Sequence, residues 1–461
     1  MTLTDYINSL RGKSIAVVGL GVSNAPLLQL LLDAGFSPSV RDKRTREKFG
    51  ETEAARLEAA GCRLFLGETY LSDLTEDVIF RTPGLHPFTP ELAAAKARGA
   101  LLTSEMEAFF SICPCRIIAV TGSDGKTTTT TIISELLKAQ GYRVFLGGNI
   151  GTPLLDKTPE MTADDWAVLE LSSFQLHSMV CRPDISVVTN VSPNHLDVHP
   201  SYEDYQTAKK QVFLGQDKTG VTVLNADNAI TRSFAAECPG SVRFFSRETE
   251  PENGTFLREG IIYRAHEGKA EPLMKADDIR IPGLHNVENY MAAFAATDGI
   301  VSDENCRAVA ESFAGVAHRL EMIRTLHGVT YCNDSIASSP TRTTAGLHAL
   351  RQKPILIAGG YDKHIPFDAL GDEICLHVKS LFLTGFTADK IYAAVTNSKY
   401  YDAQKLPITK IDDFRSAVLA AAKSAKEGDL VLLSPACASF DHFKNFVERG
   451  DTFRAIVNEL E

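Results

Sequence analysis

At 461 residues, the chain is long enough for two or three domains of roughly 150 residues each. Its 47 basic and 58 acidic side chains give a net charge of −11, which argues against a general nucleic-acid binder, because such proteins need a basic surface. No apolar run reaches the ~20 residues that span a bilayer, and the start lacks the pattern of a signal peptide. The nine cysteines are scattered and odd in number, so they predict no disulfide framework. We therefore expect a reduced, cytoplasmic protein of several domains, with no membrane span and no nucleic-acid partner.

The first hundred residues carry the outline of a βαβ unit. A run rich in β-branched residues at 14–19 predicts a buried parallel strand, a helical pattern follows at 25–32, and a second apolar run closes at Val40. Between strand and helix stands the turn Gly19-Leu-Gly-Val-Ser23, and Asp42 follows its second glycine by 21 residues. A glycine turn for a phosphate and an acid for a ribose have this arrangement.

This unit departs from the dinucleotide fingerprint in two ways. Asn24 stands where the third glycine belongs, and basic residues flank Asp42 at positions 41, 43 and 44, which suits a ligand richer in phosphate than NAD. A second strand exit on the same edge is predicted at Thr82-Pro-Gly84. From this segment alone, a nucleotide site and a purely structural turn both stay open, and a nicotinamide-dependent dehydrogenase is a fair reading.

A phosphate loop follows a second predicted strand at 116–120. The sequence Thr-Gly-Ser-Asp-Gly-Lys-Thr-Thr at 121–128 leads into a helix that extends to about Gln140. Valine replaces the first glycine of the Walker A pattern, yet the loop can still turn its backbone N–H groups toward an anion at a helix N-terminus. Lys126 would reach the β- and γ-phosphates, and the Thr127 hydroxyl would join a Mg²⁺ shell. The pattern therefore predicts that ATP or GTP binds here.

Two further strand ends carry metal-capable groups. A strand predicted at 166–169 ends in Glu170, where a Mg²⁺ ligand belongs beside a phosphate loop. The strand predicted at 185–189 exits into a segment that holds Asn194, His195 and Asp197. From the residues alone, His195 is either a metal ligand or a hydrogen-bonded structural histidine.

The helix predicted at 202–214 places Tyr205 and Lys209 on one face, since they are four residues apart, and points Lys210 elsewhere. A lone helical lysine is nearly always solvated surface, so spacing alone favours no function for Lys209.

Together with later segments, these motifs resemble the Mur ligase family, whose ATP-dependent enzymes add amino acids to the peptide of the bacterial cell-wall precursor. The order and spacing of the matching stretches are specific, although each is weak by itself. The stretches are Thr121–Thr127, Gly147–Gly151, Glu170–Gln175, Asn194–Asp197, Tyr205–Lys209, His285–Asn286, His318–Arg319, Asn333–Ser335, Gly359–Lys363 and Leu433–Ser439.

The segment Ser434–Phe446, followed by Glu448-Arg-Gly450, is most similar to the D-glutamate-adding branch of that family. The Asn-Pro-Arg motif typical of the diaminopimelate-adding branch does not occur in the sequence. The resemblance implies that the N-terminal glycine turn holds the uridine diphosphate of UDP-N-acetylmuramoyl-L-alanine rather than NAD. The alternatives are another Mur-type or folylpolyglutamate synthase-like ligase, a nicotinamide-dependent dehydrogenase and a non-catalytic nucleotide-binding regulator.

The resemblance also implies the chemistry. ATP phosphorylates the carboxylate of the alanyl substrate, and the amine of D-glutamate displaces phosphate from the acyl phosphate. Two Mg²⁺ ions are expected, with Thr127, Glu170 and His195 among their ligands, and Lys209 is expected to be carbamylated so that it also helps to hold metal. Lys126, Glu170, His195, Lys209 and Arg319 are the expected catalytic residues.

Further roles follow from the resemblance by position. For ATP, the expected contacts are Gly122, Ser123, Asp124, Gly125, Lys126, Thr127, Thr128, Asn286, Arg319 and Asp334. For the UDP-sugar and its alanyl arm, they are Gly19, Ser23, Asp42, Lys43, Arg44, Thr82, Gly84, Asn149 and Ser172. For D-glutamate, they are Ser338, Lys363, Ser439 and Phe446. The sequence departs from the family at 336–338, where Ile-Ala-Ser replaces Lys-Ala-Thr, and at Lys43-Arg44, where Thr-Arg is usual.

We expect three α/β domains: a Rossmann-like UDP-sugar domain at 1–103, a central P-loop ATPase domain with a mostly parallel sheet at 104–316, and a Rossmann-like amino-acid domain at 317–461. The central domain should include a hairpin turning at Glu259-Gly260. The last domain should have strands near 355–357, 380–383 and 430–433, and the alternation with helices predicts a largely parallel sheet. A monomer whose domains close around the substrates completes the expectation.

Overall fold

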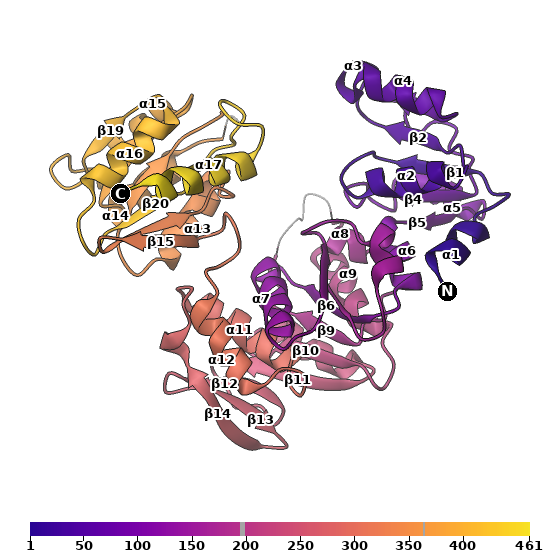
Figure 1. Ribbon diagram of the computed structural model, residues 1–461, viewed down its shortest axis with the longest axis horizontal. Coiled ribbons are helices and arrows are strands. Elements are labelled where there is room, and N and C mark those ends of the chain that lie inside the picture. The colour runs from indigo at the N-terminus through magenta and orange to yellow at the C-terminus, as the bar shows by residue number, and fades with distance from the viewer. Residues whose placement is uncertain (194–198, 363–364) are drawn as a thin grey trace. The chain divides into compact units, whose positions relative to one another are not determined.

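The structure is a computed structural model, and it describes residues 1–193, 199–362 and 365–461. The chain folds into two compact units that contain three β-sheets (Figure 1). The first unit comprises residues 1–278 and 287–310, and the second comprises residues 279–286 and 311–461. Within the described ranges, no helix combines the length and the apolar character needed to cross a membrane. His195 and Lys363 lie outside the described residues.

The N-terminal sheet is parallel throughout, in the order β3-β2-β1-β4-β5. The chain fills one side of β1 and then crosses to the other, so the switch point lies between β1 and β4, where α/β sheets bind ligands. The strand and helix predicted at 14–19 and 25–32 are confirmed as β1 and α2. The elements are α1 (Leu3–Ser9), β1 (Ile15–Val18), α2 (Asn24–Asp33), β2 (Ser39–Asp42), α3 (Arg46–Phe49), α4 (Glu51–Ala59), β3 (Arg63–Leu66), β4 (Val78–Arg81), α5 (Pro90–Ala97) and β5 (Leu101–Thr103).

The central sheet has the order β14-β13-β12-β11-β10-β9-β6-β8-β7 and is parallel from β7 to β12. The predicted strands before the phosphate loop, before Glu170 and before residue 190 are confirmed as β6, β8 and β9. The elements are α6 (Glu105–Ile112), β6 (Arg116–Thr121), α7 (Lys126–Ala139), β7 (Val144–Gly148), η1 (Leu155–Glu160), β8 (Trp166–Glu170), α8 (Ser173–Leu176), β9 (Ile185–Val188), α9 (Tyr202–Leu214), β10 (Val221–Asn225), α10 (Ala229–Ser233), η2 (Phe234–Glu237), β11 (Ser241–Ser246), β12 (Gly254–Arg258), β13 (Ile261–His266), β14 (Lys269–Lys275), η3 (Ala276–Asp278), α11 (Leu284–Ala296) and α12 (Asp303–Ser312).

The predicted hairpin joins β12 to β13, which pair antiparallel. Glu259 and Gly260 both have positive φ, 49° and 76°, which is the backbone of the tight turn that matches the twist of two antiparallel strands. A third antiparallel strand, β14, extends this edge and was not expected from the sequence.

The C-terminal sheet has the order β15-β16-β20-β17-β18-β19, and it is parallel except for the edge strand β15. The strands predicted near 355–357, 380–383 and 430–433 are confirmed as β17, β18 and β20, whereas β15, β16 and β19 were not expected. The elements are β15 (Glu321–Leu326), β16 (Val329–Asn333), α13 (Pro340–Ala349), β17 (Ile355–Ala358), α14 (Asp368–His377), β18 (Ser380–Leu383), α15 (Ala388–Thr396), β19 (Ile408–Lys410), α16 (Phe414–Ser424), β20 (Leu430–Leu433) and α17 (Phe446–Glu459).

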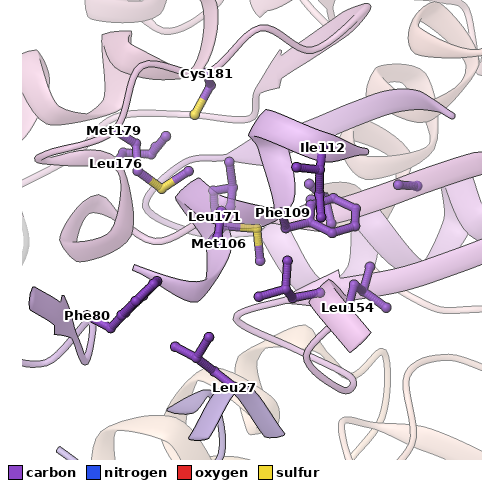
Figure 2. Packing of buried hydrophobic residues seen from close by; sticks show 14 of the residues in the cluster. Leu27, Phe80, Met106, Phe109, Ile112, Leu154, Leu171, Leu176, Met179 and Cys181 are labelled. Carbon is purple, nitrogen blue, oxygen red and sulfur yellow. The ribbon is translucent and has the colours of Figure 1, made fainter. Parts of the chain in front are cut away.

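One hydrophobic cluster joins the two sheets of the first unit. Leu27 from α2 and Phe80 from β4 belong to the same cluster as Met106 and Phe109 from α6 and Leu154 before η1 (Figure 2). These side chains are buried, so apolar packing fixes the N-terminal sheet against the central one. The glycine turn and the phosphate loop are therefore held within one packed body.

Candidate nucleotide and substrate site

The phosphate loop leaves β6 and enters α7 between two other strand ends. Gly122 has a φ of 149°, and a Cβ atom there would lie 1.9 Å from Thr189 Oγ1. Gly125, with a φ of 78°, precedes the first residue of α7. The two glycines thus let the loop turn closely against β9 and present the N-terminus of a 14-residue helix, whose N–H groups attract anions.

The exit of β9 clamps this loop. Thr189 Oγ1 donates a hydrogen bond to the carbonyl of Asp124 over 2.5 Å, and the side-chain oxygen of Asn190 accepts from the N–H of Asp124 over 2.9 Å. Neither Thr189 nor Asn190 was predicted from the sequence to have a role in the site. Their place at the end of the next parallel strand is the signal that finds them, because such ends meet at one edge of a sheet.

Lys209 is drawn into the phosphate loop. Its Nζ donates to the carbonyl of Gly122 over 2.7 Å and lies 4.5 Å from the centroid of the Tyr205 ring. The interpretation from spacing alone, a solvated surface lysine, is wrong, since Lys209 is only 1% exposed. Burial, reinforced by the nearby charge of Lys126, lowers the pKa of Lys209 well below its ordinary value.

Lys126 folds back over the same loop. Its Nζ donates to the carbonyls of Gly122 and Ser123, each over 2.9 Å. The Ser123 hydroxyl in turn lies 2.9 Å from the hydroxyl of Tyr205. The lysine nitrogens of Lys126 and Lys209 therefore both contact one carbonyl, that of Gly122.

Glu170 ends β8 beside the start of the loop, because β6 and β8 pair with Val120 opposite Glu170. One of its carboxylate oxygens accepts from the side-chain N–H of Asn149 over 2.7 Å. The other, Oε2, is buried without a hydrogen-bond partner among the described residues. An orphaned carboxylate oxygen beside a phosphate loop, with the Thr127 hydroxyl on α7, is a donor set that fits Mg²⁺.

The N-terminal glycine turn is held together by its acid. Asp42 accepts from the N–H of Leu20 over 2.9 Å and pairs with the guanidinium of Arg44 over 2.8 Å. Burial works against ionisation, but the hydrogen bonds from Arg44 and Leu20 outweigh it and lower the pKa of Asp42. Asn24 donates from its side chain to the carbonyls of Val18 and Gly19, over 3.1 and 3.0 Å. Asn24 therefore links α2 to β1 at the position of the missing glycine.

The structure contradicts the interpretation of Arg41 as one of the basic groups that would face a phosphate-rich ligand. The side chain is buried, pairs with Glu76 over 2.9 Å and stacks on Phe65 at 3.9 Å from the ring centroid. It therefore stabilises the sheet. Lys43 is exposed at the turn, whereas Arg44 is half-buried and its guanidinium is held by Asp42 and the carbonyl of Leu20.

The two predicted strand exits of the first sheet do meet. A Cβ atom on Gly19 would lie 2.6 Å from Thr82 Cγ2, which places the turn against the loop after β4. A small cavity lies beside them, lined in part by Ser23, Pro83, Gly148 and Gln175. Gly84 is exposed on this loop, and Ser172 caps α8 through a reciprocal pair of hydrogen bonds with Gln175.

In the second unit, Arg319 lies between two residues with left-handed backbone, His318 at φ 63° and Leu320 at φ 42°. Asp334 accepts from the hydroxyl of Ser434 over 2.8 Å and from the N–H of Leu320 over 3.3 Å. Burial raises the pKa of Asp334 to about 7. The fold thus brings the Arg319 and Asp334 segments together.

The Asn286 amide, elsewhere in this unit, donates to the carbonyl of Pro282 over 2.6 Å.

Arg449, which was not predicted from the sequence to have a role, links the loops that are expected to hold the amino acid. Its buried guanidinium donates to the carbonyls of Ser335 over 2.9 Å and of Cys437 over 3.1 Å.

The ring of Phe446 packs edge-on to His318, with centroids 6.0 Å apart. Ser439 is buried in one of these loops, and Ser338 is half-buried after the other.

Comparison with known families gives three matches along the chain. The model described as "Mur ligase MurD-like, N-terminal domain" matches residues 13–104. "Mur ligase middle domain" matches residues 120–297, and "Mur ligase, glutamate ligase domain" matches residues 318–437.

Two relatives align over nearly their whole length. A protein of Acetivibrio thermocellus is 50% identical, with 100% of this chain and 99% of its own length covered. A protein of Clostridium botulinum is 48% identical, with 97% of each covered. Both are named UDP-N-acetylmuramoylalanine–D-glutamate ligase.

Solved structures share the fold at low sequence identity. A UDP-N-acetylmuramate-alanine ligase from Thermotoga maritima is 16% identical, with a TM-score of 0.57 over 97% of this chain and 99% of its own. A UDP-N-acetylmuramoyl-L-alanyl-D-glutamate–2,6-diaminopimelate ligase is 20% identical, with a TM-score of 0.55 over 84% of this chain and 93% of its own. These likenesses confirm the predicted fold class.

Proposed function

Since the chain belongs to the Mur ligase family, we propose that it joins D-glutamate to UDP-N-acetylmuramoyl-L-alanine and cleaves ATP to ADP and phosphate. Relatives that share about half of its residues over nearly the whole chain carry the name of that activity. The observation that carries the proposal is the convergence of Lys126, Lys209 and Glu170 on the loop after β6.

The proposed reaction has two steps. The carboxylate oxygen of the alanyl group attacks the γ-phosphorus of ATP, which forms an acyl phosphate and releases ADP. The amine of D-glutamate then attacks the acyl carbon, an amide bond forms, and inorganic phosphate leaves with the electrons of the broken C–O bond while the amine gives up a proton.

The first step must bring two anions together, which costs roughly 4 kcal/mol for a pair of unit charges at 4 Å in a medium of intermediate dielectric. The charge of Lys126 and the partial positive charge at the N-terminus of α7 would offset that cost, because both lie at the loop that is proposed to hold the phosphates. Arg319 would add a further positive charge on the γ-phosphate.

When bound, Mg²⁺ would supply further positive charge for the transfer of the phosphoryl group. Thr127 and the orphaned oxygen of Glu170 fit this ion, and we assign His195, which lies outside the described residues, to a second one. Both of these metal-ligand assignments rest on the proposed function.

Carbamylation of Lys209 completes the proposed metal site. An uncharged amine is the form that attacks CO₂, and burial favours that form by lowering the pKa of Lys209. Attack forms an N–C bond and releases a proton, so the lysine becomes a carboxylate-like group that attracts Mg²⁺ where an ammonium would repel it.

The other substrates are assigned by position. The UDP-sugar is proposed to lie along the glycine turn, the Thr82–Gly84 loop and Asn149, next to the small cavity. The adenosine is assigned to Asn286 and Asp334, and D-glutamate to Ser338, Ser439 and Phe446, together with Lys363, which lies outside the described residues. A cytoplasmic monomer remains part of the proposal.

Phosphate release from ATP tests the specificity. With UDP-N-acetylmuramoyl-L-alanine present, release should rise at least about tenfold on adding D-glutamate and stay at its basal level with L-glutamate, L-lysine or meso-diaminopimelate. The variant Lys126→Ala serves as the control for contaminating ATPase. Release that ignored D-glutamate and rose with another amino acid would assign the chain to a different Mur-type activity.

A further inference from the structure

A cluster of imidazole and carboxylate groups lies outside the proposed ATP and Mg²⁺ site. His86 comes from the loop between β4 and α5, His177 caps the end of α8, and Asp204 lies in the first turn of α9. One potential ligand atom from each residue lies within 4.8 Å of those from the other two. The His177 Nε2 atom lies 2.9 and 3.0 Å from the two carboxylate oxygens of Asp204.

One ring nitrogen of this cluster has no explanation in the protein's own hydrogen bonds. His86 Nε2 is buried and lacks a partner among the residues that the structure describes. The His177 side chain is only 7% exposed, so bulk water has little access to it. A buried polar atom without a partner costs free energy, and its presence points to a ligand that satisfies it.

Asp204 is oriented by a second layer of hydrogen bonds. Its carboxylate lies 2.7 Å from His199 Nδ1, and His199 Nε2 lies 3.0 Å from the hydroxyl of Ser173. The His199 side chain is fully buried, so this arrangement is fixed by packing. Carboxylate ligands of metal ions are commonly oriented by such outer hydrogen bonds.

We propose that His86, His177 and Asp204 form a site for a divalent transition-metal ion of the zinc class. Two nitrogen donors and one carboxylate favour Zn²⁺ or Co²⁺ over Mg²⁺, which prefers oxygen ligands throughout. Three protein ligands leave a fourth position for water. The ion would tie the loop after β4 to α8 and α9, so it would stabilise the first unit independently of the proposed ligase activity.

Titration of the full chain with Co²⁺ tests the site, in excess Mg²⁺ so that oxygen-rich sites are already filled. A second candidate cluster, His348, Glu373 and His377, lies in the other unit and would bind in the same assay. All measurements therefore use the His348→Gln/His377→Gln background. In that background we expect one Co²⁺ per chain, with the visible absorption of four-coordinate cobalt.

Adding His86→Gln/His177→Gln should weaken this binding by at least about 100-fold, the upper end of what losing even an outer-sphere partner costs. Zn²⁺ should raise the melting temperature of the background protein and leave that of the quadruple variant unchanged. If the quadruple variant melts at a lower temperature than the background protein even in EDTA, a variant that adds only His86→Gln to the background replaces it. Because His86 lies on a loop, this variant should stay folded and still bind Co²⁺ at least about tenfold more weakly. Equal Co²⁺ affinity with and without these histidines, or no stoichiometric binding in the background protein, would overturn the proposal.

Discussion

At the scale of single residues, Lys209 decides most about the proposed mechanism. It is buried against Gly122, where burial and the nearby charge of Lys126 both disfavour a second ammonium group. Lys209→Ala should therefore lower kcat by at least about 100-fold, the scale reported for removing one preorganised electrostatic group. Steady-state phosphate release measures the loss.

Addition of formate or acetate should restore part of that activity, because a small carboxylate can occupy the space of the missing carbamate. Lys210→Ala is the matched control: the neighbouring lysine pairs with Glu237 over 2.5 Å, and its loss should change kcat by less than about twofold. A Lys209→Ala enzyme with full activity would exclude the carbamate.

Gly122 offers a second test of the phosphate loop. In Gly122→Ala the new Cβ would meet Thr189 Oγ1 at 1.9 Å, so either the loop or the clamp on it must move. ATP affinity, measured by calorimetry, should fall at least about tenfold, and the free energy of unfolding should fall by roughly 1–3 kcal/mol. Gly141→Ala is the control that separates backbone strain from the clash with Thr189. Gly141 also has positive φ, but no atom lies within 4 Å of its added Cβ. Unchanged ATP affinity in Gly122→Ala would contradict the assignment of the loop.

The sequence predicted these residues unequally, for a physical reason. Lys126 and Thr127 can be predicted because a phosphate loop is a local pattern, in which residues adjacent in sequence contact the same ligand. Lys209 is 87 residues from Gly122 along the chain, and its burial follows only from the packing of α9 on the sheet. Arg449 and the cluster around Asp204 likewise depend on contacts between distant segments, which spacing along one element does not reveal.

At the scale of elements, the helix α6 carries a buried acid that should make stability depend on pH. Glu105, its first residue, accepts from the N–H groups of Leu154 and Leu155 over 3.2 and 2.9 Å. Burial raises the pKa of Glu105 to about 7 from 4.5. The native state therefore keeps a proton that the unfolded state loses, and this contribution to stability falls as the pH rises from about 4.5 to about 7.

Glu105→Gln removes the buried charge and keeps an acceptor oxygen, so it should match the wild type near pH 4 and exceed it at pH 8. The gain should reach about 3 kcal/mol at most, the free energy that corresponds to this rise in pKa. Urea unfolding at the two pH values measures the difference. Glu91→Gln, at an exposed position on α5, should change stability by less than about 0.5 kcal/mol at either pH. A variant that is less stable than the wild type at pH 8 would contradict the prediction.

The elements themselves were predictable where burial is uniform. β17 and β20 are continuous apolar runs with turn residues on both sides, so the sequence located them from hydrophobicity alone. β15 and β14 carry charged residues on partly exposed edge strands, and their pairing with a neighbour, rather than their own composition, makes them strands. The sequence therefore does not locate these two edge strands.

At the scale of the whole molecule, the expected ATP contacts are divided between the two compact units. Residues of the phosphate loop belong to the first unit, whereas Arg319, Asp334 and Asn286 belong to the second. If these expected contacts are right, binding of one nucleotide by both sets would link the two units. Ligand-driven closure of this kind is a common way to exclude water before phosphoryl transfer.

Small-angle scattering of the full chain should therefore show a smaller radius of gyration when a non-hydrolysable ATP analogue, Mg²⁺ and UDP-N-acetylmuramoyl-L-alanine are all present. The value should move toward the roughly 23 Å expected for a compact chain of 461 residues. The Lys126→Ala variant should not contract under the same conditions, because its phosphate loop no longer holds the nucleotide that joins the units. Scattering curves of the wild type that superimpose with and without these ligands would show that the chain does not close, and the split assignment of the ATP contacts would then have to be abandoned.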